Sequence, residues 1–165
     1  MTTARTPLAR RSFRGVAVAA IAGAGIALSP LPASAHTAVA ASASATAVSS
    51  AAQTAVNTAL AQVGDRYVYG ATGPNSFDCS GLTSFSYKAA GISLPRTSKA
   101  QSTSGTPVSK GNLQPGDLVF FYSPVSHVAM YIGNGQIVHA LNSSKPVQVM
   151  KLDSMPSYAG ARRVA

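Results

Sequence analysis

Cysteine is almost absent from this chain, and tryptophan is absent altogether. The 165 residues include one cysteine, Cys79, so a fold held by disulfides within the chain is excluded. Three states remain for the thiol: pairing with another chain, burial as an inert small side chain, or action as a nucleophile. Two histidines, His127 and His139, follow it. A thiol and a base with a near-neutral pKa are what nucleophilic acyl transfer requires.

Negative charge is also scarce. Four acidic residues stand against thirteen basic ones, and the formal net charge is +9. The first 35 residues hold four of the basic residues and none of the acidic ones, which leaves +5 from nine basic and four acidic residues. The basic residues are scattered and no base-stacking motif accompanies them, so we expect no binding of nucleic acid. The positive charge favours solubility and permits loose attraction to an anionic wall polymer.

The chain lacks an apolar run long enough to span a membrane. Residues 16–28 are apolar or small, which is short of the roughly 20 residues that a spanning helix needs. Arg5, Arg10, Arg11 and Arg14 precede this run, and 33–35 (ASA) offers a cleavage site before His36. Residues 1–35 therefore predict a signal peptide and secretion, by the general route or, given the paired arginines, the twin-arginine route. We expect no membrane segment after its removal.

The rest of the chain divides into a spacer and one domain. Residues 36–50 are nearly all Ala, Ser, Thr and Val, which predicts a flexible spacer. Apolar spacing in residues 51–165 predicts helices over 51–63 and 80–90 and a helical turn within 95–102. Short β-type runs follow, at 118–121, 128–132, 136–140, 147–150 and 161–164. This order predicts an α+β fold, with N-terminal helices packed on a small antiparallel sheet as in papain-like enzymes. We expect a monomer.

Cys79 has the neighbours of a reactive thiol. Asp78 is a good helix N-cap, which would place Cys79 in the first turn of a helix. Free backbone N–H groups there favour a thiolate, and those of Cys79 or Ser80 can bind an oxyanion. Gly81 is expected to leave space for a substrate backbone. A buried inert thiol is the alternative, but the polar setting argues against it.

The two histidines can cooperate only if they share a face of one hairpin, because side chains alternate along a strand. A three-residue loop, 133–135, would pair Ile132 with Gln136 and Ala129 with His139, and so place both histidines on one face. A two-residue turn at 134–135 would separate them, so we predict the three-residue form. His127 would then be the base and His139 its orienting partner. A Cys-His-His metal site is the alternative, although these residues include no closely spaced ligand pair.

The residues that carry this chemistry lie within a series of short segments. In order, these are 67–70 (YVYG), 73–74 (GP), 77–82 (FDCSGL), 94–98 (LPRTS), 113–118 (LQPGDL), 127–133 (HVAMYIG) and 138–140 (VHA). Together they resemble the NlpC family of bacterial cell-wall cysteine peptidases, which have a papain-like fold. The resemblance runs from about residue 51 to the end of the chain, and 51–165 is identified as an NlpC-type peptidase domain.

The resemblance implies a role for each matching position. Cys79 would be the nucleophile, His127 the base and His139 the third polar residue. Tyr67 would contact the substrate or stabilise charge beside the nucleophile, or simply pack as an aromatic residue. Asp78 and Ser80 match positions that contact the amino end of the stem peptide in some members.

The resemblance also implies a reaction. Members usually hydrolyse the bond between D-glutamate and the diamino acid in peptidoglycan stem peptides through an acyl-enzyme, with neither a metal nor an organic cofactor. Two alternatives stay open. One is amidase or acyltransferase chemistry on the same fold, and the other is a non-catalytic wall-binding module.

Overall fold

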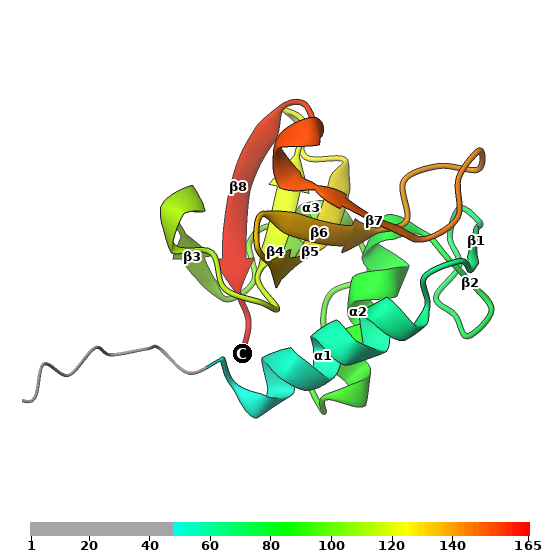
Figure 1. Ribbon diagram of the computed structural model, residues 1–165, viewed down its shortest axis with the longest axis horizontal. Helices are drawn as coiled ribbons and strands as arrows, with labels where there is room; N and C mark the ends of the chain where they lie inside the picture. The colour runs from blue at the N-terminus through cyan, green and yellow to red at the C-terminus, as the bar shows by residue number, and fades with distance from the viewer. Residues whose placement is uncertain (1–47) are drawn as a thin grey trace, which may run out of the picture. The chain divides into compact units, whose positions relative to one another are not determined.

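The computed structural model describes residues 48–165, which form helices and an antiparallel sheet (Figure 1). The helices are α1 (Ser50–Ala61), α2 (Cys79–Ala89) and the short α3 (Ser98–Gln101). The signal peptide predicted over 1–35, and the predicted spacer up to residue 47, lie outside the described residues. Within residues 48–165, none of the helices has the length and apolar character to cross a membrane.

Six strands form the main sheet, in the order β3-β8-β4-β5-β6-β7, with every neighbouring pair antiparallel. Their bounds are β3 Thr106–Val108, β4 Leu118–Phe121, β5 His127–Gly133, β6 Gln136–His139, β7 Gln148–Lys151 and β8 Tyr158–Arg163. Strands β4 to β7 follow one another as a meander, and β8 returns to the free side of β4. The predicted α+β fold with helices on an antiparallel sheet is confirmed.

Some short elements were not predicted from the sequence. Two-residue strands β1 (Arg66–Tyr67) and β2 (Ser76–Phe77) pair in parallel beside the start of α2. Strand β3 and two single turns of 3-10 helix, Lys110–Asn112 and Leu152–Ser154, were also missed. Such elements are too short to show a hydrophobic period.

The core lies on both faces of the sheet. Alternate residues of the central strands, such as Leu118, Phe120 and Val128, pack in one cluster with α1 and α2. The intervening residues, such as Val119 and Phe121, form a second cluster on the other face with Leu152 and Met155. Because both faces are covered, β4 is buried along its whole length and reads as a continuous apolar run.

The first helix differs from its prediction at both ends. Ser49 caps it by accepting a hydrogen bond from the Ala52 N–H, so it begins at Ser50, inside the predicted spacer. It ends at Ala61, before the predicted end at 63. Leu60 and Val63 fit the helical period but are 38% and 47% exposed, because no other element covers them.

The turn before β4 fixes the position of α1 and of the C-terminal strand. Gly116 lies so close to α1 that a Cβ there would stand 2.6 Å from the Ala52 Cβ. Next to it, the buried Asp117 accepts bonds of 2.8 Å and 2.7 Å from the Arg163 guanidinium on β8. This explains the Pro-Gly-Asp segment as a packing and pairing motif.

The β5–β6 hairpin corrects the predicted loop. Gly133 pairs with Gln136, so the turn has two residues, Asn134 and Gly135, both with positive φ as in a type I′ turn. A bulge between Tyr131 and Gly133 then shifts the register by one residue, and Met130 pairs with Val138. The predicted three-residue loop was therefore wrong. The bulge nevertheless gives the same strand register, in which Met130 pairs with Val138, as the three-residue loop would have given. Both histidines keep a common face.

Candidate active site

Cys79 is the first residue of α2, where the sequence placed it. The Asp78 side chain caps the helix, and its Oδ1 accepts a 2.6 Å bond from the Gly81 N–H. The thiol is partly exposed on the wall of a cavity of about 360 Å³, which we call the nucleophile cavity. The backbone N–H of Val128, the residue after His127, lowers the pKa of the thiol, which places this group near the sulfur. The start of α2 and the start of β5 therefore meet at this sulfur.

Burial and hydrogen bonding act on the thiol in opposite directions. Burial is the larger effect and raises the pKa of Cys79 above its ordinary value, and the Asp78 charge also raises it. Backbone N–H groups of Val128, Ser80 and Cys79 lower that pKa. The helix terminus was expected to favour the thiolate, but the net shift favours the thiol at rest. A base would have to remove the proton for the sulfur to act as a nucleophile.

His127 and His139 form a buried pair. Their Nε2 and Nδ1 atoms are 3.0 Å apart, and the two residues are 4% and 0% exposed. Burial lowers the pKa of both, and the proximity of His139 lowers that of His127 further. Both rings are thus neutral near pH 7, and His127 keeps Nδ1 as the nitrogen that His139 does not engage.

Asp78, Ser80 and Arg96 form a closed polar network. The Arg96 guanidinium donates bonds of 3.1 Å and 2.6 Å to the two Asp78 oxygens and one of 3.0 Å to the Ser80 hydroxyl. The Gly70 N–H and the Gly81 N–H also donate to the same carboxylate. Two carboxylate oxygens offer about four acceptor sites, so Asp78 is saturated. The sequence left Arg96 without a role, and it proves to organise one wall of the cavity.

Gly81 corrects another expectation. A Cβ at this position would lie 2.1 Å from the carbonyl oxygen of Ala71. The space beside Gly81 is therefore occupied by the loop before α2 and not left for a substrate backbone.

Gln101 was missed by sequence reasoning. Its side chain is fully buried, and its amide nitrogen donates to the carbonyls of Ser80 and Pro95 at 3.1 Å and 2.9 Å. Its amide oxygen accepts from the Thr83 hydroxyl at 2.8 Å. These bonds hold α3, and with it the segment that carries Arg96, against the first turn of α2. A single glutamine in a polar segment does not indicate, from sequence alone, that its side chain is buried and hydrogen-bonded in this way.

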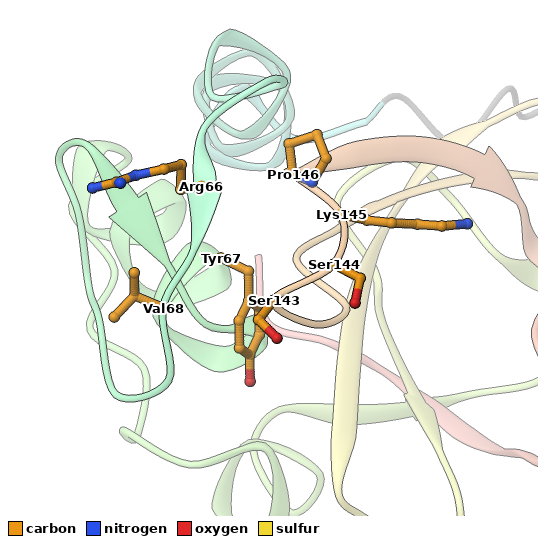
Figure 2. A pocket seen from close by; sticks show the side chains of 7 residues that line it. All are labelled: Arg66, Tyr67, Val68, Ser143, Ser144, Lys145 and Pro146. Atoms are coloured by element: carbon orange, nitrogen blue, oxygen red, sulfur yellow. The ribbon is translucent and has the colours of Figure 1, made fainter.

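Tyr67 stands between two cavities. It lines the nucleophile cavity, whose other walls are the loop of Tyr69 and Gly70, the start of α2, and residues 96–98 and 126. It also lines a second cavity of about 450 Å³, which we call the cationic cavity (Figure 2). Burial raises the pKa of the Tyr67 hydroxyl, and the nearby Cys79 charge raises it further. The hydroxyl is thus a neutral hydrogen-bond donor near the sulfur.

The described residues do not form the Cys-His-His metal site that was the alternative. Across 48–165, no three His, Cys, Asp or Glu side chains converge as ligands of one ion.

Comparison with known proteins identifies this arrangement. A profile of the NlpC/P60 family matches residues 64–163, which span the sulfur, the histidine pair and all strands of the main sheet. The chain belongs to the NlpC/P60 family. This confirms the resemblance found in the sequence, and members of this family are peptidases.

Three relatives show what the chain is similar to. A protein of Corynebacterium glutamicum named a probable endopeptidase is 51% identical over 114 residues, which are 69% of this chain and 54% of that protein. A gamma-D-glutamyl-L-lysine dipeptidyl-peptidase of Bacillus cereus is 41% identical over 121 residues, 68% of this chain and 36% of the other. The structure of the peptidoglycan hydrolase RipB from Mycobacterium tuberculosis superposes with a TM-score of 0.63 at 27% identity, covering 69% of this chain and 64% of RipB. The chain thus spans about half the length of its Corynebacterium relative.

Proposed function

We propose that this protein is a secreted cysteine endopeptidase that hydrolyses the γ-D-glutamyl–diamino acid bond of peptidoglycan stem peptides. The observation that carries the proposal is the placement of Cys79 at a capped helix start, beside the strand on which His127 forms a neutral pair with His139. The names of relatives support it, since they include an endopeptidase, a γ-D-glutamyl peptidase and a peptidoglycan hydrolase.

Attack on the substrate begins with proton transfer. His127 Nδ1 takes the thiol proton as the sulfur bonds to the carbonyl carbon, and the His127 Nε2–H donates to His139 Nδ1. The carbonyl oxygen becomes an oxyanion that backbone N–H groups at the start of α2 stabilise. His139 holds His127 in the tautomer that this step needs.

The intermediate then collapses in two stages. The C–N bond breaks, the amine leaves with the proton from His127 Nδ1, and a thioester to Cys79 remains. Water next attacks the thioester while His127 takes its proton, which releases the carboxylic acid and regenerates the thiol. Every proton in the cycle passes through His127, and no oxidant or further group is consumed.

The nucleophile cavity accommodates the acyl half of the substrate in this proposal. The Tyr67 hydroxyl donates to the reacting carbonyl or to the oxyanion, and Ser80 lies toward the amino end of the stem peptide. Asp78 acts through Arg96 and through the helix cap, because its acceptor sites are already filled. An ammonium group at the amino end of the stem peptide thus finds no free acceptor site on Asp78.

Defined muropeptides test the reaction. The purified protein is incubated with them beside a Cys79→Ala control, and the products are identified by mass spectrometry. Fragments that end in γ-D-glutamate, absent from the control, support the endopeptidase. Cleavage at another bond would retain the Cys-His mechanism and indicate an amidase. No cleavage by a folded protein whose Cys79 also resists iodoacetamide would leave a wall-binding module.

Export is part of the same proposal. We expect the protein recovered from the medium or the wall to begin at His36, after removal of a signal peptide. N-terminal sequencing checks this, and an intact Met1 on the secreted protein would contradict it.

A further inference from the structure

The cationic cavity lies between two segments that are far apart in the sequence. One wall is Arg66, Tyr67 and Val68, from β1 and the residue after it. The other wall is 143–146, in the loop between β6 and β7, and Figure 1 shows this loop beside β1 and β2. Because Tyr67 also lines the nucleophile cavity, the two cavities adjoin at Tyr67.

The charge of this cavity has one sign. Arg66 and Lys145 line it with three hydroxyl groups, those of Tyr67, Ser143 and Ser144, and its lining as described contains no acidic residue. Neither cation forms an ion pair with another residue in 48–165. Both side chains are exposed, and Figure 2 shows them leaving opposite walls with their charged ends pointing away from each other. The two charged ends thus lie at separate edges of the cavity, and these exposed side chains turn inward in order to bind a ligand held between the walls.

The field of Lys145 reaches the histidine pair. Its charge lowers the pKa of His139, second only to burial. The cationic cavity is therefore electrostatically adjacent to the reacting groups, as well as adjoining them at Tyr67.

We infer that the cationic cavity binds the leaving half of the substrate and that Arg66 and Lys145 select a diamino acid with a carboxylate on its side chain. This inference rests on the proposed function. A peptide bond held at Cys79 must extend to both sides of the sulfur, and the nucleophile cavity takes the acyl half. The adjoining cationic cavity then receives the diamino acid whose amine is released.

The chemistry of the two common kinds of diamino acid decides between them. Lysine presents only an ammonium group at its side-chain end, which would meet two like charges and no acidic partner in this cavity. Meso-diaminopimelate adds a carboxylate at that end. A guanidinium can bind such a carboxylate with two parallel hydrogen bonds, and an ammonium group can bind it as a point charge.

Three tripeptides test the selection. They share L-Ala-γ-D-Glu and end in meso-diaminopimelate, in its side-chain amide, or in L-lysine. We expect kcat/KM to be at least about tenfold higher for the diaminopimelate peptide than for the lysine peptide, the usual size of one charge-assisted contact. The amide should behave like lysine, and the preference should shrink at high salt because the cations are exposed.

Substitution of Arg66 and Lys145 tests whether these two residues cause the preference for the diaminopimelate peptide. Arg66→Gln/Lys145→Gln should bring the ratio of the two kcat/KM values close to one, mainly through KM for the diaminopimelate peptide. Lys88→Gln/Lys151→Gln removes the same charge from exposed positions outside the cavity and should leave the ratio unchanged. Because each variant serves as its own reference, a general loss of stability does not move the ratio.

The outcomes separate this inference from the proposed function. Equal cleavage of the lysine and diaminopimelate peptides, or a preference that persists in the Arg66→Gln/Lys145→Gln variant, overturns the inference and leaves the endopeptidase intact. Absence of cleavage of all three peptides by the wild-type protein overturns the proposed function itself.

Discussion

The two cavities that adjoin at Tyr67 are built in opposite ways. In the nucleophile cavity the charged groups bind one another, since Asp78, Ser80 and Arg96 form one network that also caps α2. In the cationic cavity Arg66 and Lys145 are exposed and form no ion pair within residues 48–165. The first arrangement holds reacting groups in place, and a change there disturbs the fold. The second can change its charge at little cost in stability, which suits a part of the site that sets specificity.

The largest effect should come from the histidine pair beside the nucleophile cavity. His139→Leu removes the partner of His127 Nε2, so we expect kcat to fall by roughly 10²- to 10⁴-fold with KM little changed. His139→Asn retains an acceptor oxygen and should lose less. Steady-state kinetics on a defined stem peptide measures both. A His139→Leu variant with near-normal kcat would show that His139 is only a core residue.

The next effect tests the difference in stability between the two cavities. Asp78→Ala removes the helix cap and leaves Arg96 and the Gly70 N–H without their partner. We expect the free energy of unfolding in urea to fall by roughly 2 kcal/mol, mostly through the lost cap and the unpaired Gly70 N–H, because the Arg96 side chain is 42% exposed and water can solvate it. Lys145→Ala, on the exposed loop, should change it by less than about 0.5 kcal/mol. Similar losses in the two variants would mean that the two cavities do not differ in what they contribute to stability.

The pH dependence of stability reports on the buried pair. The pKa is lowered to about 3 for His127 and about 4 for His139, so the unfolded chain binds more protons below its own histidine pKa of about 6.5. The stability that depends on these neutral rings is complete above that pH and is lost as the pH falls toward the folded values. We expect the free energy of unfolding at pH 5.5 to be about 2–3 kcal/mol below its value at pH 8.

Urea titrations at several pH values check this expectation. A His127→Gln/His139→Gln variant carries no such groups and should show a nearly flat profile between pH 8 and pH 5.5. A wild-type profile that is equally flat would mean that both rings titrate in the folded protein with the same pKa as in the unfolded chain, as hydrated imidazoles do.

The sequence predicted the frame of the nucleophile cavity because that frame depends on local rules. Capping by Asp78 and the apolar period after it locate α2, and the apolar runs at 118–121 and 128–132 locate β4 and β5. The hairpin shows the limit of such rules. Asn134-Gly135 does form the two-residue turn that the dipeptide favours. However, a bulge after Tyr131 shifts the strand register by one residue, and no residue type there predicts a bulge.

The cationic cavity could not be predicted because its walls are joined only by tertiary folding. Arg66 and Lys145 are separated by most of the domain, and each alone reads as an ordinary surface cation. The burial of Gln101 and the exposure of Leu60 have the same cause. Hydrophobic period and residue type give the face of an element, whereas the neighbouring element decides whether that face is covered.

The smallest effect tests whether the two cavities are electrostatically separate. Lys145 lowers the pKa of His139, although burial lowers it more. Lys145→Gln should therefore raise the pKa of His139 slightly while leaving it below its ordinary value, and Arg66→Gln should leave it unchanged. NMR titration of the His139 ring at low salt measures this, and added salt should reduce the difference between Lys145→Gln and wild type. An equal shift in both variants would mean that the cationic cavity acts on the histidine pair as a unit, so that the two charges proposed to select the substrate would also tune the proposed base.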